Sequence, residues 1–379
     1  MSFAVLAAVL LLCFPEASAQ GALQGLTFCL GTLLPSTFPF LVLSAFCVQS
    51  GLSRWLEPLF APVTRTLFSL PGCCGPTILL GLLGGYPAGV RGIAALYRQG
   101  SVTAGQAARM LGFCVNAGPA FTISVIGAGL YGNLWLGCLI FFSVSGASLL
   151  LGILLGGWDR LRRRKASRPE PTSGSLPASA PLPFGEALTA SAADAARGML
   201  NACCFVILFS ACLSILHTAG ITVLLFRGMH AAGIPATAAA SLFPLFWEIG
   251  SGAADACAFG APLALAGGAV GFGGLCIHFQ ILSMASGFHP PRLPFFLSRL
   301  LHALFSAGFL LALLSLFPPF PLGEETAVFH NTASALQGGL SATHAPPIRA
   351  VAAAAALLAL CIVLVAGGIR KSKGNRKIR

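Results

Sequence analysis

The sequence predicts an all-α polytopic membrane protein, an inverted-repeat, transporter-like bundle with re-entrant or broken helices. Of its 379 residues, 56% are hydrophobic and 8% are charged, whereas soluble domains carry about 25% charged residues. Several apolar segments are long enough to span a bilayer, and Gly and Pro interrupt some of them. Broken backbone persists at membrane depth only where it is buried in protein or lines a wet cavity.

The positive charge of the chain lies beside predicted spans. The formal net charge is +12, and twelve of the 22 Lys and Arg residues fall within 160–168 and 370–379. Basic clusters that flank spans are topology signals and contacts for anionic lipid headgroups. We therefore expect both clusters to be cytoplasmic and to contact the bilayer, and we expect no nucleic-acid partner.

The first segment, 1–24, is predicted to be an N-terminal helix that stays uncleaved. Residues 3–14 are apolar, and Ala17-Ser18-Ala19 resembles a signal-peptide cleavage site. No Lys or Arg precedes the apolar run, although a signal peptide begins with positive charge. An uncleaved anchor is therefore favoured over the alternative, a cleaved signal peptide.

The first membrane repeat, 25–156, is expected to be gate-like. Gly and Pro mark its kinks and breaks, because Gly weakens a helix and Pro removes a backbone donor. Its predicted elements are, in chain order, a kinked span (Gly25–Val48), an amphipathic or interfacial helix (Ser53–Leu70), a broken stretch (Leu79–Arg91), a polar segment in which Thr103 caps a helix (Leu96–Ala108), a span interrupted at Asn116–Pro119 (Arg109–Ala128) and a plain span (Leu134–Gly156).

The second membrane repeat, 184–317, follows a basic, Pro- and Ser-rich linker (157–183) that is predicted to be flexible and cytoplasmic. Its predicted elements are a polar start (Phe184–Arg197), a span (Gly198–Thr218), a short apolar piece (Ile221–Phe226), a broken stretch (Leu242–Gly252), a span interrupted at Gly271–Gly274 (Pro262–Ala285) and a further span (Pro294–Phe317). An extracytoplasmic loop (318–347) and a last transmembrane helix with a basic cytoplasmic tail (348–379) are expected to complete the chain.

The two halves resemble each other in the order and character of their elements. The broken stretch 82–89 corresponds to 246–252, and the break at 116–119 corresponds to that at 271–274. With both basic clusters in the cytoplasm, corresponding spans run in opposite directions. Inverted halves with paired broken helices are a recurring plan of secondary transporters, so the repeat favours a transport function.

The stretch Leu79–Arg91 is the centre of this prediction. It is apolar but carries four Gly residues and Pro87. We expect a re-entrant or discontinuous helix whose exposed backbone handles a solute, because unpaired backbone groups in hydrocarbon cost several kcal/mol each. The alternative is a tightly packed turn between two helices.

Glu248 and Asp255 are the acidic candidates for ion or proton coupling. A carboxylate at membrane depth is expensive and is by default a functional hypothesis. Glu248 could bind a cation, carry a proton or accept a hydrogen bond from a solute. Its structural alternative is to pair with Arg109 or with a freed backbone amide, and Asp255 could instead be interfacial.

Neutral residues beside the breaks are candidate solute contacts. Asn116 offers both a donor and an acceptor, or caps a broken helix. Gln280 is preferred to His278, since residues two apart on a helix face different directions; His278 could carry a proton or be structural. Tyr86 could stack on an aromatic solute or simply pack at the kink.

Arg91, Arg299 and His302 are interpreted mainly as interface anchors, although Arg91 could also attract an anion. The sequence contains no metal-ligand spacing among its Cys and His residues and no nucleophile elbow, Walker loop or HExxH motif. We therefore expect no metal site, no cofactor and no enzymatic activity.

A family resemblance is carried by five stretches in order: LPSTFPFLVLSAF (34–46), LLGGYPAGVR (82–91), ALYRQGSVTAGQAARMLGFCVNAGPAF (95–121), WEIGSG (247–252) and GFGGLCIHFQILS (271–283). Together they resemble the YlbJ (SpoVV) family of sporulation integral membrane proteins, which are nucleoside-recognition or gate-domain membrane proteins. The resemblance covers about residues 15 to 317.

The resemblance implies a fold similar to concentrative nucleoside transporters and a role in spore formation, in the outer forespore membrane. It implies transport of a small organic anion or aromatic metabolite, with dipicolinic acid favoured; the alternatives are a nucleoside-type solute and a non-transporting scaffold for spore envelope assembly. Association of several copies of the chain is left open. By motif match, it implies that the solute path is lined by Gly85, Tyr86, Pro87, Gly89, Asn116, Gly118, Glu248, Ser251, Gly252, Gly274 and Gln280.

Overall fold

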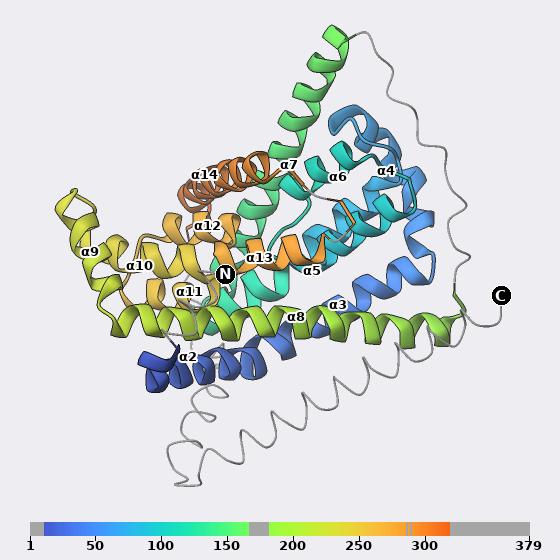
Figure 1. The fold of residues 1–379 in the computed structure, drawn as a ribbon. Helices are drawn as coiled ribbons and strands as arrows, with labels where there is room; N and C mark the ends of the chain where they lie inside the picture. The colour runs from blue at the N-terminus through green and yellow to red at the C-terminus, as the bar shows by residue number, and fades with distance from the viewer. Residues whose placement is uncertain (1–10, 167–181, 286, 289, 319–379) are drawn as a thin grey trace.

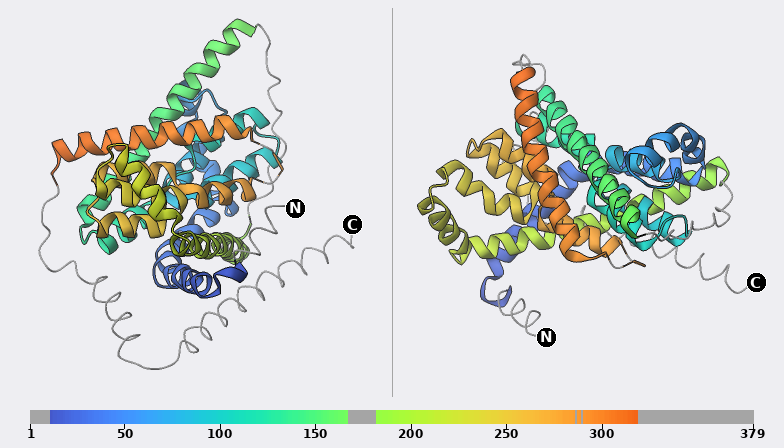
Figure 2. Two further views of the ribbon diagram at one scale, coloured as in Figure 1. Left: turned by 60° about the vertical axis from the view of Figure 1, so that its left-hand side comes forward. Right: turned by 90° about the horizontal axis from the view of Figure 1, so that it is seen from above.

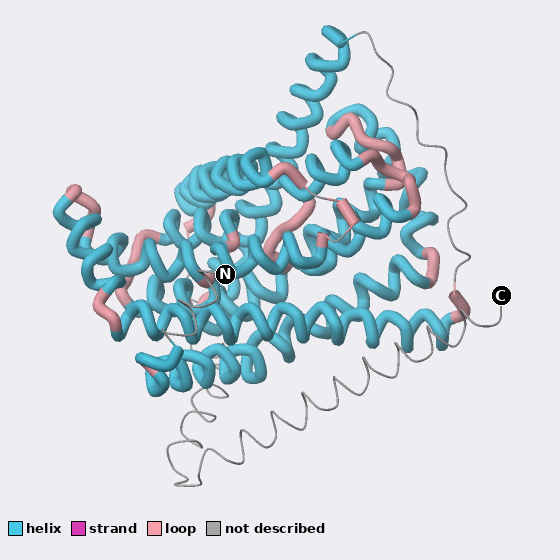
Figure 3. Tube along the Cα trace, viewed as in Figure 1, coloured by secondary structure: helices cyan, strands magenta, loops and turns pink. Residues whose placement is uncertain are grey.

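The structure, a computed structural model, describes residues 11–166, 182–285, 287–288 and 290–318. Helices form a bundle throughout these residues, and no strand occurs among them (Figures 1, 2 and 3). From residue 319 onward, the predicted loop, last transmembrane helix and basic tail lie outside the described residues.

The elements are named as in Figure 1. In chain order they are α2 (Pro15–Phe28), the π-helix η1 (Cys29–Leu33), α3 (Leu34–Gln49), α4 (Leu52–Leu67), α5 (Cys74–Arg98), α6 (Ala104–Phe113), the π-helix η2 (Ala120–Leu130), α7 (Leu134–Ala166), α8 (Phe184–Thr218), α9 (Ile221–Ala231), α10 (Ala236–Trp247), α11 (Ile249–Ala258), α12 (Leu263–Phe272), α13 (Gly274–Met284) and α14 (Arg292–Leu316).

Six helices in the described part of the chain are long and apolar enough to cross a membrane. This finding confirms the predicted all-α polytopic membrane class. The six are Pro15–Gln49, Cys74–Arg98, Leu134–Arg162, Phe184–Thr218, Leu263–Met284 and Arg292–Leu316.

The first helix of each half packs against the other over much of its length. A Cβ atom on Gly21 would lie only 2.6 Å from the Cβ of Ser214, so the two backbones approach closely there. Further along, Leu41 and Ala195 share one buried cluster. Residue numbers rise along Pro15–Gln49 as they fall along α8, so the two helices are antiparallel (Figure 1).

Helix boundaries differ from the prediction at three places. The helix is continuous across residues 24 and 25, where we placed a boundary, and α7 extends through the start of the predicted linker to Ala166. The polar start 184–197 and the span after it form the single helix α8. Ala, Leu, Glu and Arg are good helix formers, so polar composition at these places does not end the helix.

Two local predictions are confirmed. The helix α4 is amphipathic, with Trp55 and Leu59 exposed on one face and Thr64 buried on the other. Thr103 caps α6 in a capping box: its hydroxyl accepts from the backbone N–H of Gln106, whose side chain accepts from the N–H of Thr103.

Glycines let α5 pack directly onto the backbone that follows α6. A Cβ atom on Gly89 would lie 2.5 Å from the carbonyl oxygen of Cys114, and one on Gly81 would overlap the same oxygen. Both residues are buried within α5. The backbone of α5 is therefore in direct contact with the backbone at Cys114. This contact fixes the position of the break in α5 relative to the end of α6.

We predict that Gly81→Ala lowers the melting temperature of the detergent-purified protein, by the equivalent of about 1–3 kcal/mol, because overpacking displaces the backbone at Cys114. Differential scanning fluorimetry measures the shift. Gly157→Ala is the matched control, since no atom lies within 4 Å of the added Cβ. Equal melting temperatures for the two variants would contradict the proposed backbone contact.

Candidate functional site

Helices are interrupted at all four predicted places. α5 breaks at Gly85 (φ 81°, ψ −175°), and residues 114–118 separate α6 from η2 without helical structure. Glu248 is extended (φ −143°, ψ 119°) between α10 and α11, and Gly273 (φ 88°) separates α12 from α13. The broken stretch 79–91 is thus a discontinuous helix.

Within each half, the two interruptions contact each other. A Cβ atom on Gly118 would lie 2.9 Å from the amide nitrogen of Gly85, so the two breaks of the first half meet. A Cβ atom on Gly274 would lie 3.2 Å from the amide nitrogen of Ile249, which joins the breaks of the second half. The two halves therefore use the same pairing of breaks.

Arg299 on α14 ties the breaks of the two halves together. Its Nη1 donates to the carbonyl oxygen of Val115 (2.8 Å), its Nη2 to Gly271 (2.6 Å) and its Nε to Phe272 (3.2 Å). These carbonyls lie at or just beyond the C-terminal ends of α6 and α12, where no intrahelical donor is available. One guanidinium thus satisfies backbone groups that both breaks leave unpaired.

Tyr86, directly after the break in α5, makes a second bond between the halves. Its hydroxyl donates to the carbonyl oxygen of Val270 (2.7 Å), and the Arg299 Cζ lies over its ring, 5.8 Å from the centroid.

The interpretation of Arg299 and His302 as interface anchors is wrong, since both side chains are fully buried. His302 Nε2 donates to the carbonyl oxygen of Val144 on α7 (2.9 Å). A basic residue near the start of an apolar helix commonly anchors it at the interface. Here α14 instead packs its polar face against the breaks, whose free carbonyls need donors.

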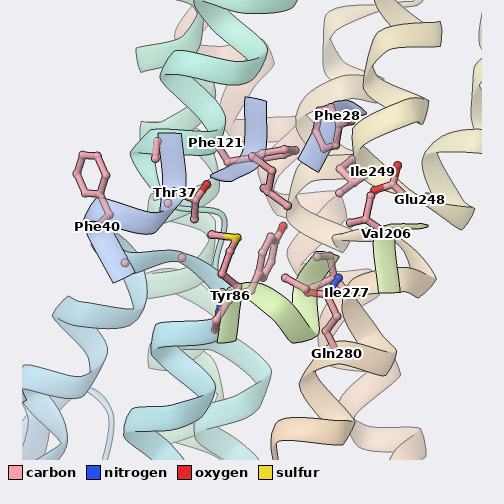
Figure 4. A pocket seen from close by; sticks show the side chains of 18 of the residues that line it. Phe28, Thr37, Phe40, Tyr86, Phe121, Val206, Glu248, Ile249, Ile277 and Gln280 are labelled. Carbon is pink, nitrogen blue, oxygen red and sulfur yellow. The ribbon is translucent and has the colours of Figure 1, made fainter. Parts of the chain in front are cut away.

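A mostly apolar cavity lies between the breaks, and the centre of a water-sized sphere can occupy about 60 Å³ of it. In Figure 4, Thr37 and Phe40 lie on one side of Tyr86, and Glu248 and Gln280 lie on the other side. The lining residues are Phe28, Leu33, Thr37, Phe40, Leu83, Gly84, Gly85, Tyr86, Pro87, Gly118, Ala120, Phe121, Met199, Ala202, Val206, Glu248, Ile249, Ile277 and Gln280.

The structure brings part of the predicted site to this cavity. The predicted residues that line it are Gly85, Tyr86, Pro87, Gly118, Glu248 and Gln280. The predicted residues outside its lining are Gly89, Asn116, Ser251, Gly252, Gly274, Asp255 and His278. Solute binding and ion coupling stay predictions for all of them.

Glu248 is 1% exposed and caps the N-terminus of α11. Its Oε1 accepts from the N–H of Gly250 (2.8 Å), and its Oε2 accepts from the N–H (2.6 Å) and hydroxyl (2.7 Å) of Ser251. Arg109 pairs with Asp159 instead (2.7 Å). Of the two structural alternatives, bonding to freed amides is therefore realised, and the helix N-terminus stabilises the negative charge.

The predicted residues outside the lining have packing roles. His278 Nδ1 donates to the carbonyl oxygen of Gly274 (2.6 Å), and its ring stacks on Phe296. Asn116 is fully buried, and its Nδ2 lies 3.4 Å from the carbonyl oxygen of Val144. Asp255 is half-buried on α11. Spacing along a helix does not fix which way it is rotated about its axis, so the sequence alone does not tell which of these side chains face the cavity.

The apolar wall of the cavity was not predicted. One part of this wall comes from the first helix of the first half, which supplies Phe28, Leu33, Thr37 and Phe40. The other part comes from α8, the antiparallel neighbour of that helix, which supplies Met199, Ala202 and Val206. The signal that could have found them is the loose sequence similarity between residues 25–45 and residues 198–214, which lie in the first span of each half. Among the described residues, no three His, Cys, Asp or Glu side chains are arranged to hold a metal ion.

One curated relative supports the sequence resemblance. The sporulation integral membrane protein YlbJ of Bacillus subtilis (strain 168) is 25% identical over a 318-residue match that covers 79% of this chain and 78% of that protein. No protein-family model and no solved structure matches the chain. The predicted resemblance to the YlbJ family is confirmed, and the six apolar helices agree with an integral membrane protein.

We predict that Gly85→Ala destabilises the protein by about 1–3 kcal/mol, because this backbone conformation is accessible almost only to glycine. A Cβ atom on Gly85 would have no neighbour closer than 3.6 Å, so the cost is backbone strain and not a clash. Thermal melting in detergent measures it, with Gly157→Ala as control. An unchanged melting temperature would show that α5 relaxes to a regular helix without penalty.

Proposed function

We propose that this protein is a sporulation-associated membrane transporter or facilitator of a small organic anion or aromatic metabolite, with dipicolinic acid as the favoured solute. The observation that carries the proposal is an aromatic-lined cavity, with a single carboxylate in its lining, where the helix breaks of both halves meet. The sporulation setting is taken from the YlbJ relative. The chain lies in the outer forespore membrane, with its linker and C-terminus in the cytoplasm.

The two halves form an inverted repeat like that of concentrative nucleoside transporters. Two observations support an inverted repeat. The helix Pro15–Gln49 pairs antiparallel with α8, and the two breaks within each half contact each other in the same way. Such transporters place the solute between discontinuous helices near the middle of the membrane. The cavity of this chain occupies the corresponding position between Gly85, Gly118 and Glu248.

The cavity suits a flat ring with polar edges. Tyr86 and Phe121 offer aromatic surfaces for stacking. Thr37 and Gln280 offer hydrogen bonds at opposite sides, and Glu248 accepts from a donor on the solute or holds a coupling cation. The protein acts as a carrier, with no covalent step and no cofactor.

The charge of Glu248 restricts the form in which an acid enters. Two like charges 4 Å apart repel by about 4 kcal/mol even at an effective dielectric constant of about 20. None of the described residues that line the cavity is Lys or Arg, so none of them offsets this repulsion directly. Dipicolinic acid therefore enters with a proton, or a cation, on the carboxyl group that faces Glu248.

The absence of Lys and Arg among the lining residues also favours a second candidate, a neutral nucleoside-type solute. Such a solute stacks its base on the same aromatic residues and donates a hydroxyl hydrogen bond to Glu248. The two candidates are separated by direct competition between solutes in the uptake assay below.

We predict that Glu248→Gln slows uptake of radiolabelled dipicolinic acid into proteoliposomes at least about tenfold, because the protonated carboxyl group of the solute loses its charged acceptor and a loss of about 1.4 kcal/mol gives that factor. Faster uptake would show instead that release of the repulsion between Glu248 and the dianion dominates. The variant should insert normally, because a glutamine oxygen still caps α11. Glu186→Gln, an exposed glutamate at the start of α8, is the control. Wild-type uptake by Glu248→Gln would refute the assigned role. Failure of the wild-type protein to move either dipicolinic acid or nucleosides would favour the scaffold alternative.

We predict that initial uptake of dipicolinic acid rises as the external pH falls, by up to about tenfold per pH unit between about pH 7.5 and 5.5, because the singly protonated solute becomes more abundant. The neutral diamide of the same acid should show no such dependence. A flat profile for the acid would mean that the dianion is carried.

A further inference from the structure

Arg299 carries a buried positive charge that no carboxylate pairs with in the part of the chain that the structure describes. It is 0% exposed, and none of the ion pairs in the described part of the chain includes it. Its partners are carbonyl oxygens at the ends of α6 and α12. Helix C-termini bear a partial negative charge, so they stabilise the guanidinium and offset part of its positive potential, although they do not remove its formal charge.

The ring of Tyr86 lies against this charge and also lines the cavity. The ring lines the cavity, and the Arg299 Cζ lies 5.8 Å from the ring centroid. A Cβ atom on Gly273 would lie 3.4 Å from both the Arg299 Nη2 and the Tyr86 hydroxyl, so both groups meet at that break. A buried site weakens electric fields far less than water does, so the charge acts through the ring.

We propose that Arg299 sets the charge preference of the carrier, as a positioning residue that acts from behind Tyr86. The inference rests on the proposed transport function and adds to it the orientation of the bound solute. The Tyr86 wall is positive because of Arg299, and the wall at Glu248 is negative. An ionised carboxylate of the solute orients toward Tyr86, and its protonated or donor group orients toward Glu248.

The deciding variant is Tyr86→Ala, which removes the ring and keeps Arg299 with its three carbonyl bonds. Uptake in proteoliposomes is measured for dipicolinic acid and for its neutral diamide, which share the ring that Tyr86 would stack on. Both solutes lose the same stacking contact in this variant, so the ratio of their KM values reports the effect of the solute's charge. We expect the ratio to shift roughly tenfold in favour of the acid, because the guanidinium then faces the carboxylate directly. Tyr97→Ala on the same helix, against Phe288 and outside the cavity lining, is the control.

A second pair of variants, at Arg299, tests the positive charge directly: one variant keeps it and the other removes it. Arg299→Lys keeps the charge and should keep the preference for the acid, although with slower transport, since lysine cannot reach all three carbonyls. Arg299→Met should lose the preference. If Arg299→Met does not fold, the Tyr86→Ala ratio still decides.

The outcomes separate the two proposals. An unchanged KM ratio in Tyr86→Ala, or a shift toward the diamide, overturns the role of Arg299 and leaves transport intact. Uptake of neither solute by the wild-type protein overturns the transport function and this inference together.

Discussion

The constraint that governs this structure is that every backbone group freed by a helix break needs a partner inside the protein. In hydrocarbon an unpaired carbonyl or amide costs several kcal/mol. Arg299 bonds the carbonyls of Val115, Gly271 and Phe272, and Glu248 bonds the amides at the start of α11. The cavity exists because these two side chains stabilise the broken backbone around it.

The same arrangement explains how an acidic and a basic side chain lie in an apolar bundle without pairing with each other. Glu248 lies at the N-terminus of α11, and Arg299 lies at the C-terminal ends of α6 and α12, so each side chain faces the helix end of opposite partial charge. The side chains that bond the freed backbone groups thus lie in the cavity lining, as Glu248 does, or against a lining residue, as Arg299 does.

The positions of the breaks were predictable from sequence, whereas the residues that complete the site were not. Gly85, Gly273 and the segment 114–118 are local features, because Gly and Pro disfavour a helix wherever they occur. Arg299 bonds carbonyls far from it in sequence, and the wall from Phe28 to Phe40 depends on how two distant helices pack. Such contacts depend on the rotation and tilt of whole helices, which neither hydropathy nor spacing specifies.

Gly81 and Gly89 lie on either side of the break in α5, and both press against the carbonyl oxygen of Cys114. That oxygen holds both arms of α5 at one point, and neither arm can slide along the backbone after α6 without losing the contact. Under the proposed transport function, the movement left open to α5 would be a tilt of its two arms about the Cys114 carbonyl.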